Sequence, residues 1–136
     1  LVHEQSQAWD PVLAFAREAL GARFVLAEGV MFVSQPEASL AAVAAAVDEI
    51  AQAGPGAPFR IAALSIMTTL TGSALIALAI AKGAMSVEEG WRAAHVDEDF
   101  QIRAWGSDTA AQARRERRWL DMQAAARLYG LMVDAD

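Results

Sequence analysis

The sequence contains no cysteine, a single lysine and only two histidines. Without cysteine there is neither a disulfide framework nor a thiolate for catalysis or metal binding. His3 and His95 do not have the spacing of a metal-binding motif, so we expect no metal site. The formal net charge of −6 argues against a broad nucleic-acid surface, because such surfaces are basic.

The common nucleotide-binding and hydrolase motifs are also absent. The sequence has no P-loop and no GxGxxG run, and neither Ser65 nor Ser73 lies in a nucleophile elbow. No residue pattern resembles a secretory signal peptide, and the chain begins at Leu1 rather than at methionine. We therefore expect a non-enzymatic protein without a cofactor, and a fragment or processed product that lacks an N-terminal part.

A charge-free run from Ile61 to Ala81 is the element around which we expect the other helices to pack. Its second half, 74–81, is apolar on every side, which requires burial in a protein core or in a bilayer. The run is long enough to span a bilayer, but hydroxyl side chains and Gly72 interrupt it and no Trp or Tyr flanks it. We predict two buried helices, near 58–70 and 73–83, and keep a membrane anchor as the alternative.

Capping residues and glycines mark the ends of the helices in the first half of the chain. Asp10-Pro11 is predicted to open a first helix, which Gly21 ends. Ser34-Gln-Pro-Glu37 has the pattern of a capping box and predicts a second helix, which Gly54-Pro55-Gly56 ends. Only the segment near 23–33 has the composition of extended backbone, either as a short β-hairpin or as an irregular connection.

Similar signals divide the second half. Ser86-Val-Glu-Glu89 is a second capping box and predicts a helix that Gly106 ends after Trp105. The Ser107-Asp108 pair is predicted to cap the last helix. Together the patterns predict a mainly α fold, with about six helices around the buried pair, in one domain over residues 1–136 that we expect to be a monomer.

The predicted helix 87–105 is apolar on two sides when it is drawn as one continuous helix. Glu98 falls in the middle of one apolar stripe, so we expect it to be buried and structural, paired with an arginine or with backbone N–H groups. A general acid or base is the alternative, although no nucleophile or second acid completes a catalytic set. Asp97 and Gln101 lie on an outer edge of the same helix, and His95 lies on a polar edge.

Four arginines lie close together near the start of the last helix, within 114–118. They could form a phosphate-binding or nucleic-acid-binding patch. We favour a solvated face that balances the acidic residues of the preceding helix, because the net charge is negative. Arg115 or Arg118 is expected to turn toward Glu98, and the role of the cluster stays open.

The segment Val96-Asp-Glu-Asp-Phe-Gln-Ile-Arg-Ala-Trp-Gly106 resembles the signature of the ATP synthase assembly chaperones that bind the free alpha subunit of the catalytic sector. That signature is an acidic triplet, an aromatic residue, Gln and then Trp-Gly. Further matches keep the family's order along the chain, and the resemblance extends from about Trp9 to Leu131. These matches are Trp9-Asp10-Pro11, Glu28-Gly29-Val30 with Gln35-Pro36, and Thr71-Gly72-Ser73 with Ser86-Val87-Glu88-Glu89.

The resemblance implies a chaperone that holds the alpha subunit and covers the surface that the beta subunit will take. It implies that this chain is the helical C-terminal domain, and that the family's N-terminal β-rich domain is absent. The family's important acidic position maps onto Asp97. We expect the partner-binding surface to consist of Asp97, Gln101, Phe100 and Trp105. We expect structural roles for Glu98, Gly72 and Gly106.

The alanine-rich composition, with arginine in place of lysine, indicates a bacterial protein and therefore the cytoplasm. The mitochondrial matrix is expected if the source is eukaryotic. Two alternatives to the chaperone stay open at this point. One is a small membrane-anchored helical protein that uses 61–81, and the other is a helical protein-binding module of another pathway.

Overall fold

The computed structural model describes residues 1–26 and 32–135 of the chain. Within these residues it contains seven α-helices and no β-strand, which confirms the predicted mainly α fold. The segments 23–26 and 32–33 are irregular, and the family match at Glu28-Gly29-Val30 lies outside the described residues. The helices are α1 (Val2–Ala19), α2 (Glu37–Ala51), α3 (Ala57–Thr71), α4 (Ala74–Ala81), α5 (Val87–Ala94), α6 (Val96–Trp105) and α7 (Thr109–Ala135).

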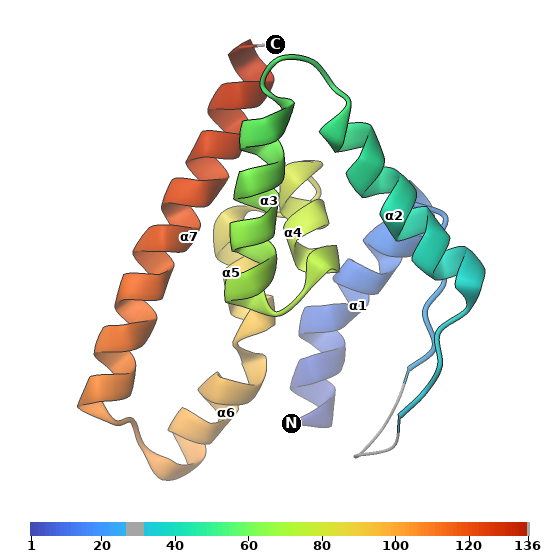
Figure 1. Cartoon of the computed structure of the whole chain (residues 1–136). Helices are drawn as coiled ribbons and strands as arrows, with labels where there is room; N and C mark the ends of the chain where they lie inside the picture. Colours follow the sequence, from blue (N-terminus) through green and yellow to red (C-terminus); the bar gives the residue numbers. More distant parts are fainter. Residues whose placement is uncertain (27–31, 136) are drawn as a thin grey trace.

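Helices α3 and α4 lie at the centre of the molecule (Figure 1). The long helix α7 runs along one side of α3, and α2 lies on the other side, while α1 and α5 pack against α4. Six of the seven helices therefore contribute to one apolar core, whereas α6 contributes no buried residue. The larger side chains of the core are Phe15, Ile50, Leu64, Met67, Leu78, Trp91, Met122 and Tyr129.

The predicted helix pair at the centre is confirmed. Gly72 ends α3 in the left-handed region, with φ of 70°, which glycine adopts without a steric penalty. Ser73 then caps α4, because its hydroxyl accepts a hydrogen bond from the Ile76 N–H at 3.1 Å. Leu78 in α4 and Met67 in α3 have no exposed surface. Among the described residues, no helix combines the length and the apolar character that crossing a bilayer requires.

Helix α1 begins at Val2 and contains Pro11 in its interior, so the predicted start at Asp10-Pro11 is wrong. Contacts with α5 and α6 explain the additional turns. The indole N–H of Trp9 donates to the Ala93 carbonyl at 2.7 Å, and Gln5 donates to the Asp97 carboxylate at 2.7 Å. Tertiary contacts therefore stabilise a helix that continues through a residue usually found at helix ends.

The predicted capping box at 34–37 is also wrong, because Pro36 is the N-cap of α2 and no side chain caps it. The polar side chains of this region bind the preceding irregular segment instead. Gln35 accepts a hydrogen bond from the Val25 N–H at 2.8 Å and donates to the Val25 carbonyl at 2.9 Å. The buried Ser39 hydroxyl donates to the Arg23 carbonyl. The bonds of Gln35 pair two irregular segments, the bond of Ser39 ties α2 to the first of them, and the described residues 21–26 and 32–36 contain no strand.

The capping box at the start of α5 is confirmed. The Ser86 hydroxyl accepts from the Glu89 N–H and the Glu89 carboxylate accepts from the Ser86 N–H, each at 3.1 Å. The hydrogen bond from the Ser86 N–H, together with the Ser86 hydroxyl beside the carboxylate, holds the pKa of the Glu89 carboxyl below its ordinary value. Asp108 accepts from the Ala110 N–H at 2.9 Å and so caps the start of α7, as predicted.

Candidate functional site

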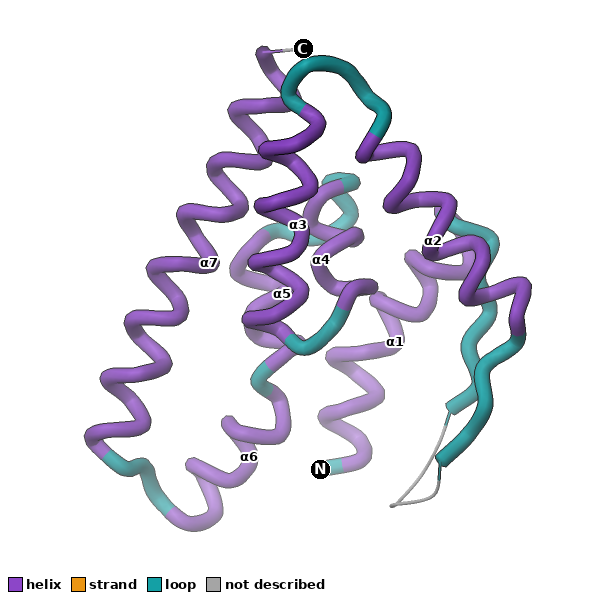
Figure 2. Tube along the Cα trace, viewed as in Figure 1, coloured by secondary structure: helices purple, strands orange, loops and turns teal. Residues whose placement is uncertain are grey.

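A break at His95 separates α5 from α6, so the predicted single helix over 87–105 is wrong (Figure 2). His95 has φ of −112° and ψ of 15°, outside the helical region. Its ring Nδ1 lies 2.8 Å from the Trp91 carbonyl, which in a continuous helix would accept from the His95 backbone N–H. That backbone N–H donates to the Arg92 carbonyl instead, at 3.2 Å. The side chain of His95 therefore replaces a backbone bond at the point where the chain turns.

The imidazole of His95 is buried, although the sequence placed it on a polar edge. Its ring lies against that of Trp91, tilted by 40° with the ring centroids 4.0 Å apart, and Trp91 in turn contacts Trp119 at 5.3 Å between centroids. Arg118 donates to Nε2 at 3.0 Å, which fits a neutral ring with its proton on Nδ1. Burial lowers the pKa of His95 below 6.5, and the positive charges of Arg115 and Arg118 lower it further. The hydrogen bond to the Trp91 carbonyl and the negative charge of Glu98 raise the pKa, but they do not offset the lowering.

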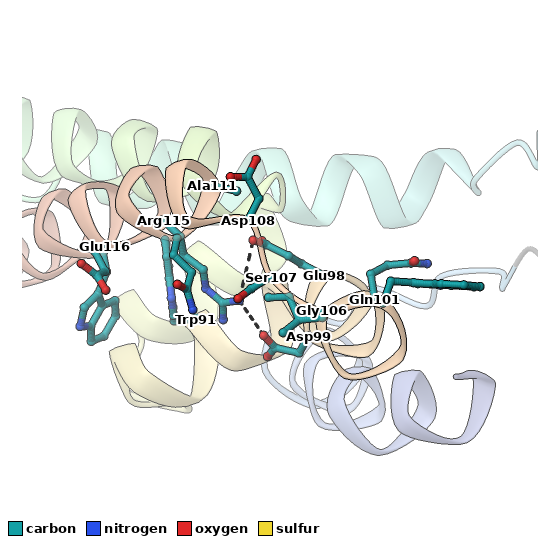
Figure 3. Close-up of a pocket in the computed structure, with 14 residues that line it drawn as sticks. Trp91, Glu98, Asp99, Gln101, Gly106, Ser107, Asp108, Ala111, Arg115 and Glu116 are labelled. Atoms are coloured by element: carbon teal, nitrogen blue, oxygen red, sulfur yellow. Dashed lines mark hydrogen bonds and ion pairs between the residues drawn. The ribbon is translucent and has the colours of Figure 1, made fainter.

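Two neighbouring carboxylates of α6 bind one arginine of α7 (Figure 3). The Arg115 guanidinium lies 2.6 Å from the Asp99 carboxylate and 3.8 Å from that of Glu98. The predicted arginine partner of Glu98 is thereby confirmed, but its predicted burial is wrong, because 38% of the side chain is exposed. The prediction failed because the break at His95 turns the α6 surface away from the stripe drawn on a continuous helix. The structural role of Glu98 stays a prediction.

Three of the four expected partner-binding residues share one exposed edge of α6. Asp97, Gln101 and Trp105 are four residues apart in turn and are all exposed, with Trp105 83% exposed. Phe100 is half-buried and so offers less surface. Asp97 accepts the hydrogen bond from Gln5, and Arg103 pairs with Glu4 at 2.5 Å, so α1 supports α6 from one side. Gly106 ends α6 with φ of 85°, in the region that favours glycine.

A groove of about 560 Å³ lies between α6 and the first half of α7, and no sequence pattern predicted it. We call it the α6–α7 groove. It is open because α6 packs against α1 and α5, and no described part of α6 packs closely against the backbone of α7. Its lining combines aromatic and aliphatic side chains with carboxylates and one arginine, principally Trp91, Glu98, Asp99, Ile102, Trp105, Asp108, Arg115, Glu116 and Trp119.

The arginines of 114–118 divide between two environments. Arg115 and Arg118 are largely shielded from solvent and bind Asp99 and His95, whereas Arg114 and Arg117 are exposed. The cluster is therefore only partly the solvated face that the sequence predicts. Within the described residues, no group of three or more His, Asp or Glu side chains is placed to hold a metal ion.

No protein-family model and no curated protein matches the chain. Solved structures do match it. The Atu1473 protein of Agrobacterium tumefaciens, described as a candidate chaperone, is 45% identical with a TM-score of 0.87, over 95% of this chain and 46% of that one. Atp12 of Paracoccus denitrificans is 30% identical with a TM-score of 0.86, over 96% of this chain and 54% of that one.

A mutant form of the same Paracoccus denitrificans protein matches with the same identity and TM-score. The chain spans about half the length of each solved protein. The likeness covers nearly all of this chain and includes sequence as well as fold. The resemblance drawn from the sequence motifs is thereby confirmed: this chain is similar, in sequence and in fold, to the ATP synthase assembly chaperone Atp12.

Proposed function

We propose that this chain is the helical domain of an assembly chaperone that binds the unassembled alpha subunit of ATP synthase. In this proposal the chaperone shields the surface that the beta subunit later covers. The observation that carries the proposal is the match to Atp12 in both sequence and fold over almost the whole chain. The α6 signature, which first suggested the family, lies on the surface of the molecule rather than in its core.

The exposed edge of α6 is the proposed contact with the alpha subunit, with Asp97 at its centre. Trp105 supports this choice, because a large aromatic side chain that is 83% exposed is typical of binding surfaces. Asp97 and Gln101 would add polar contacts that orient the partner. Phe100 is a secondary candidate because half of its surface is covered.

We further propose that the protein acts without catalysis and without a cofactor. The α6 carboxylates that could serve as acids or bases are engaged with Arg115 and His95. The composition supports action in a bacterial cytoplasm, and the family supports the mitochondrial matrix for a eukaryotic source. The solved relatives are about twice as long, so we propose that this helical domain works together with a β-rich domain of the same protein.

Co-expression with the alpha subunit tests the function directly, using the full-length chaperone. The expected result is that the alpha subunit stays soluble and co-purifies with the chaperone, and that it precipitates when expressed alone. Failure of the parent chaperone to keep the alpha subunit in solution would contradict the proposed function.

The Asp97→Lys variant tests the proposed surface. It reverses one charge on the α6 edge and removes the exposed hydrogen bond to Gln5, which contributes at most about 1 kcal/mol to stability. We expect a melting temperature no more than about 5 °C below the parent value, and loss of alpha-subunit capture. Asp48→Lys on α2 is the matched control, because Asp48 is also an exposed acid on a helix. Equal capture by both variants would move the contact surface away from α6.

A further inference from the structure

The α6–α7 groove has an aromatic floor, and its wall on the α6 side carries apolar surface that the fold leaves uncovered. Trp91 forms the floor and is itself 6% exposed, with Trp119 beside it at 5.3 Å between ring centroids. Ile102 and Trp105 form the wall on the α6 side. The hydrophobic effect favours covering such surface, at about 25 cal/mol for each Å² of apolar area removed from water. An occupant must therefore offer an apolar side chain.

The rim of the same groove is acidic. Four carboxylates line it, those of Glu98, Asp99, Asp108 and Glu116, against the single guanidinium of Arg115. Arg115 lies closest to Asp99, at 2.6 Å, and so mainly neutralises that one charge. The remaining acids leave the rim negative on both the α6 and the α7 sides.

The other arginines of 114–118 do not line the groove. Arg118 lies over the Trp91 ring, 5.9 Å from its centroid, and donates to the imidazole of His95, while Arg114 and Arg117 are exposed outside the groove lining. Figure 3 shows Arg115 reaching from α7 to the two α6 carboxylates across the space between the helices. This link ties α6 to α7 across the groove.

An apolar floor with an acidic rim is complementary to an apolar side chain flanked by basic residues. We propose that the α6–α7 groove receives an aromatic or long aliphatic side chain of the alpha subunit that has a lysine or arginine beside it. This inference rests on the proposed function and extends it, because it assigns a second contact surface and the chemistry of the segment it binds. Trp105 belongs both to the exposed edge of α6 and to the groove, so the two surfaces are continuous.

Two substitutions in the full-length chaperone test the two halves of this complementarity. Trp105→Ala removes apolar surface from the wall, and Glu116→Arg reverses a rim charge on α7. Each is expected to lower the alpha subunit recovered on co-expression by about tenfold or more, as is typical of central interface residues. Because both side chains are exposed, the melting temperature is expected to stay at the parent value.

Matched controls lie on other surfaces. Leu120→Ala removes a large side chain that is 65% exposed but does not line the groove, and Glu88→Arg reverses an exposed acid of α5 that also lies outside it. Both controls should recover as much alpha subunit as the parent. If the two groove variants also match the parent, the groove inference is wrong while the proposed function stands. If the parent itself captures no alpha subunit, both fail.

Photo-cross-linking identifies the occupant. A benzophenone side chain is placed at position 112, where the exposed Gln112 lines the groove on α7. A cross-link to an alpha-subunit segment with an apolar residue next to lysine or arginine supports the proposal. Cross-links to a second copy of the chaperone, to its own further domain, or to an acidic or uncharged alpha-subunit segment would overturn it. Absence of any cross-link in a complex that has formed would also overturn it.

Discussion

Replacing Gly90 with alanine would test how closely α5 packs on α4. Gly90 is buried in the interior of α5, opposite two isoleucines of α4. A Cβ atom at this position would lie 2.6 Å from Ile80 Cδ1, 3.0 Å from Ile80 Cγ1 and 3.1 Å from Ile76 Cγ2. The first contact can be relieved by moving the end of a flexible side chain. The third involves a branched side chain that is only 4% exposed and has little room to move.

Two opposing effects decide the magnitude. Alanine is favoured over glycine in a helix by about 0.5–1 kcal/mol. Overpacking a well-filled core typically costs about 1–3 kcal/mol. The three contacts place Gly90→Ala toward the middle of that range, so we expect a net loss of about 1 kcal/mol. In a domain of this size that loss lowers the melting temperature by roughly 3–5 °C.

Gly130→Ala is the matched control. Gly130 lies in α7, and a Cβ atom there would meet nothing within 4 Å, so only the helix-propensity gain remains. Urea unfolding followed by circular dichroism gives the free energy of unfolding of each variant. We expect Gly130→Ala to be more stable than the parent and Gly90→Ala to be less stable. If Gly90→Ala equals or exceeds Gly130→Ala in stability, the α4–α5 packing described above is wrong.

Three further predictions concern the core, a helix cap and pH. Leu78→Asp places an unpaired charge at a fully buried position and should cost about 4 kcal/mol or more, so parent-like urea unfolding would contradict the central position of α4. Ser86→Ala removes the capping hydroxyl and should lower the free energy of unfolding by about 1 kcal/mol in the same assay, whereas no loss would mean that the cap is not needed. The pKa of His95 lies below the 6.5 of an ordinary histidine, so the unfolded chain takes up a proton more readily than the folded chain. The stability that neutral His95 provides is therefore present above pH 6.5 and is lost as the pH falls below that value. His95→Gln should therefore lose less stability than the parent between pH 7.5 and 5.5, and equal losses would contradict a buried neutral imidazole.

Local chemistry determined much of the fold. The charge-free run required burial, Gly72 required a turn, and Ser86 with Glu89 predicted a helix start that the structure contains. These features depend on residues within a few positions of one another, so the physical cause is contained in a short segment. The family signature at 96–106 likewise depends on consecutive residues, and the likeness to Atp12 confirms the resemblance that it suggested.

Other features depend on residues that are distant in the sequence, and local patterns could not predict them. Helix α1 continues through Pro11 because Trp9 and Gln5 bind α5 and α6, more than 80 residues away. Arg60 is buried beside the apolar run because it donates to the carbonyls of Met132, at 3.1 Å, and Ala53. Without those acceptors a charged group would be expected on the surface.

The candidate site shows the same division. The residues at 97–105 could be selected from the sequence, because their signature and their four-residue spacing are local. Their surroundings could not, because a helical wheel assumes one continuous helix, and His95 interrupts it by binding the carbonyl of Trp91. The direction of α6, the exposure of Glu98 and the groove opposite Arg115 all follow from that interruption and from the position of α7. Tertiary structure alone decided them, since the angle between two packed helices is determined by side chains that meet only after folding.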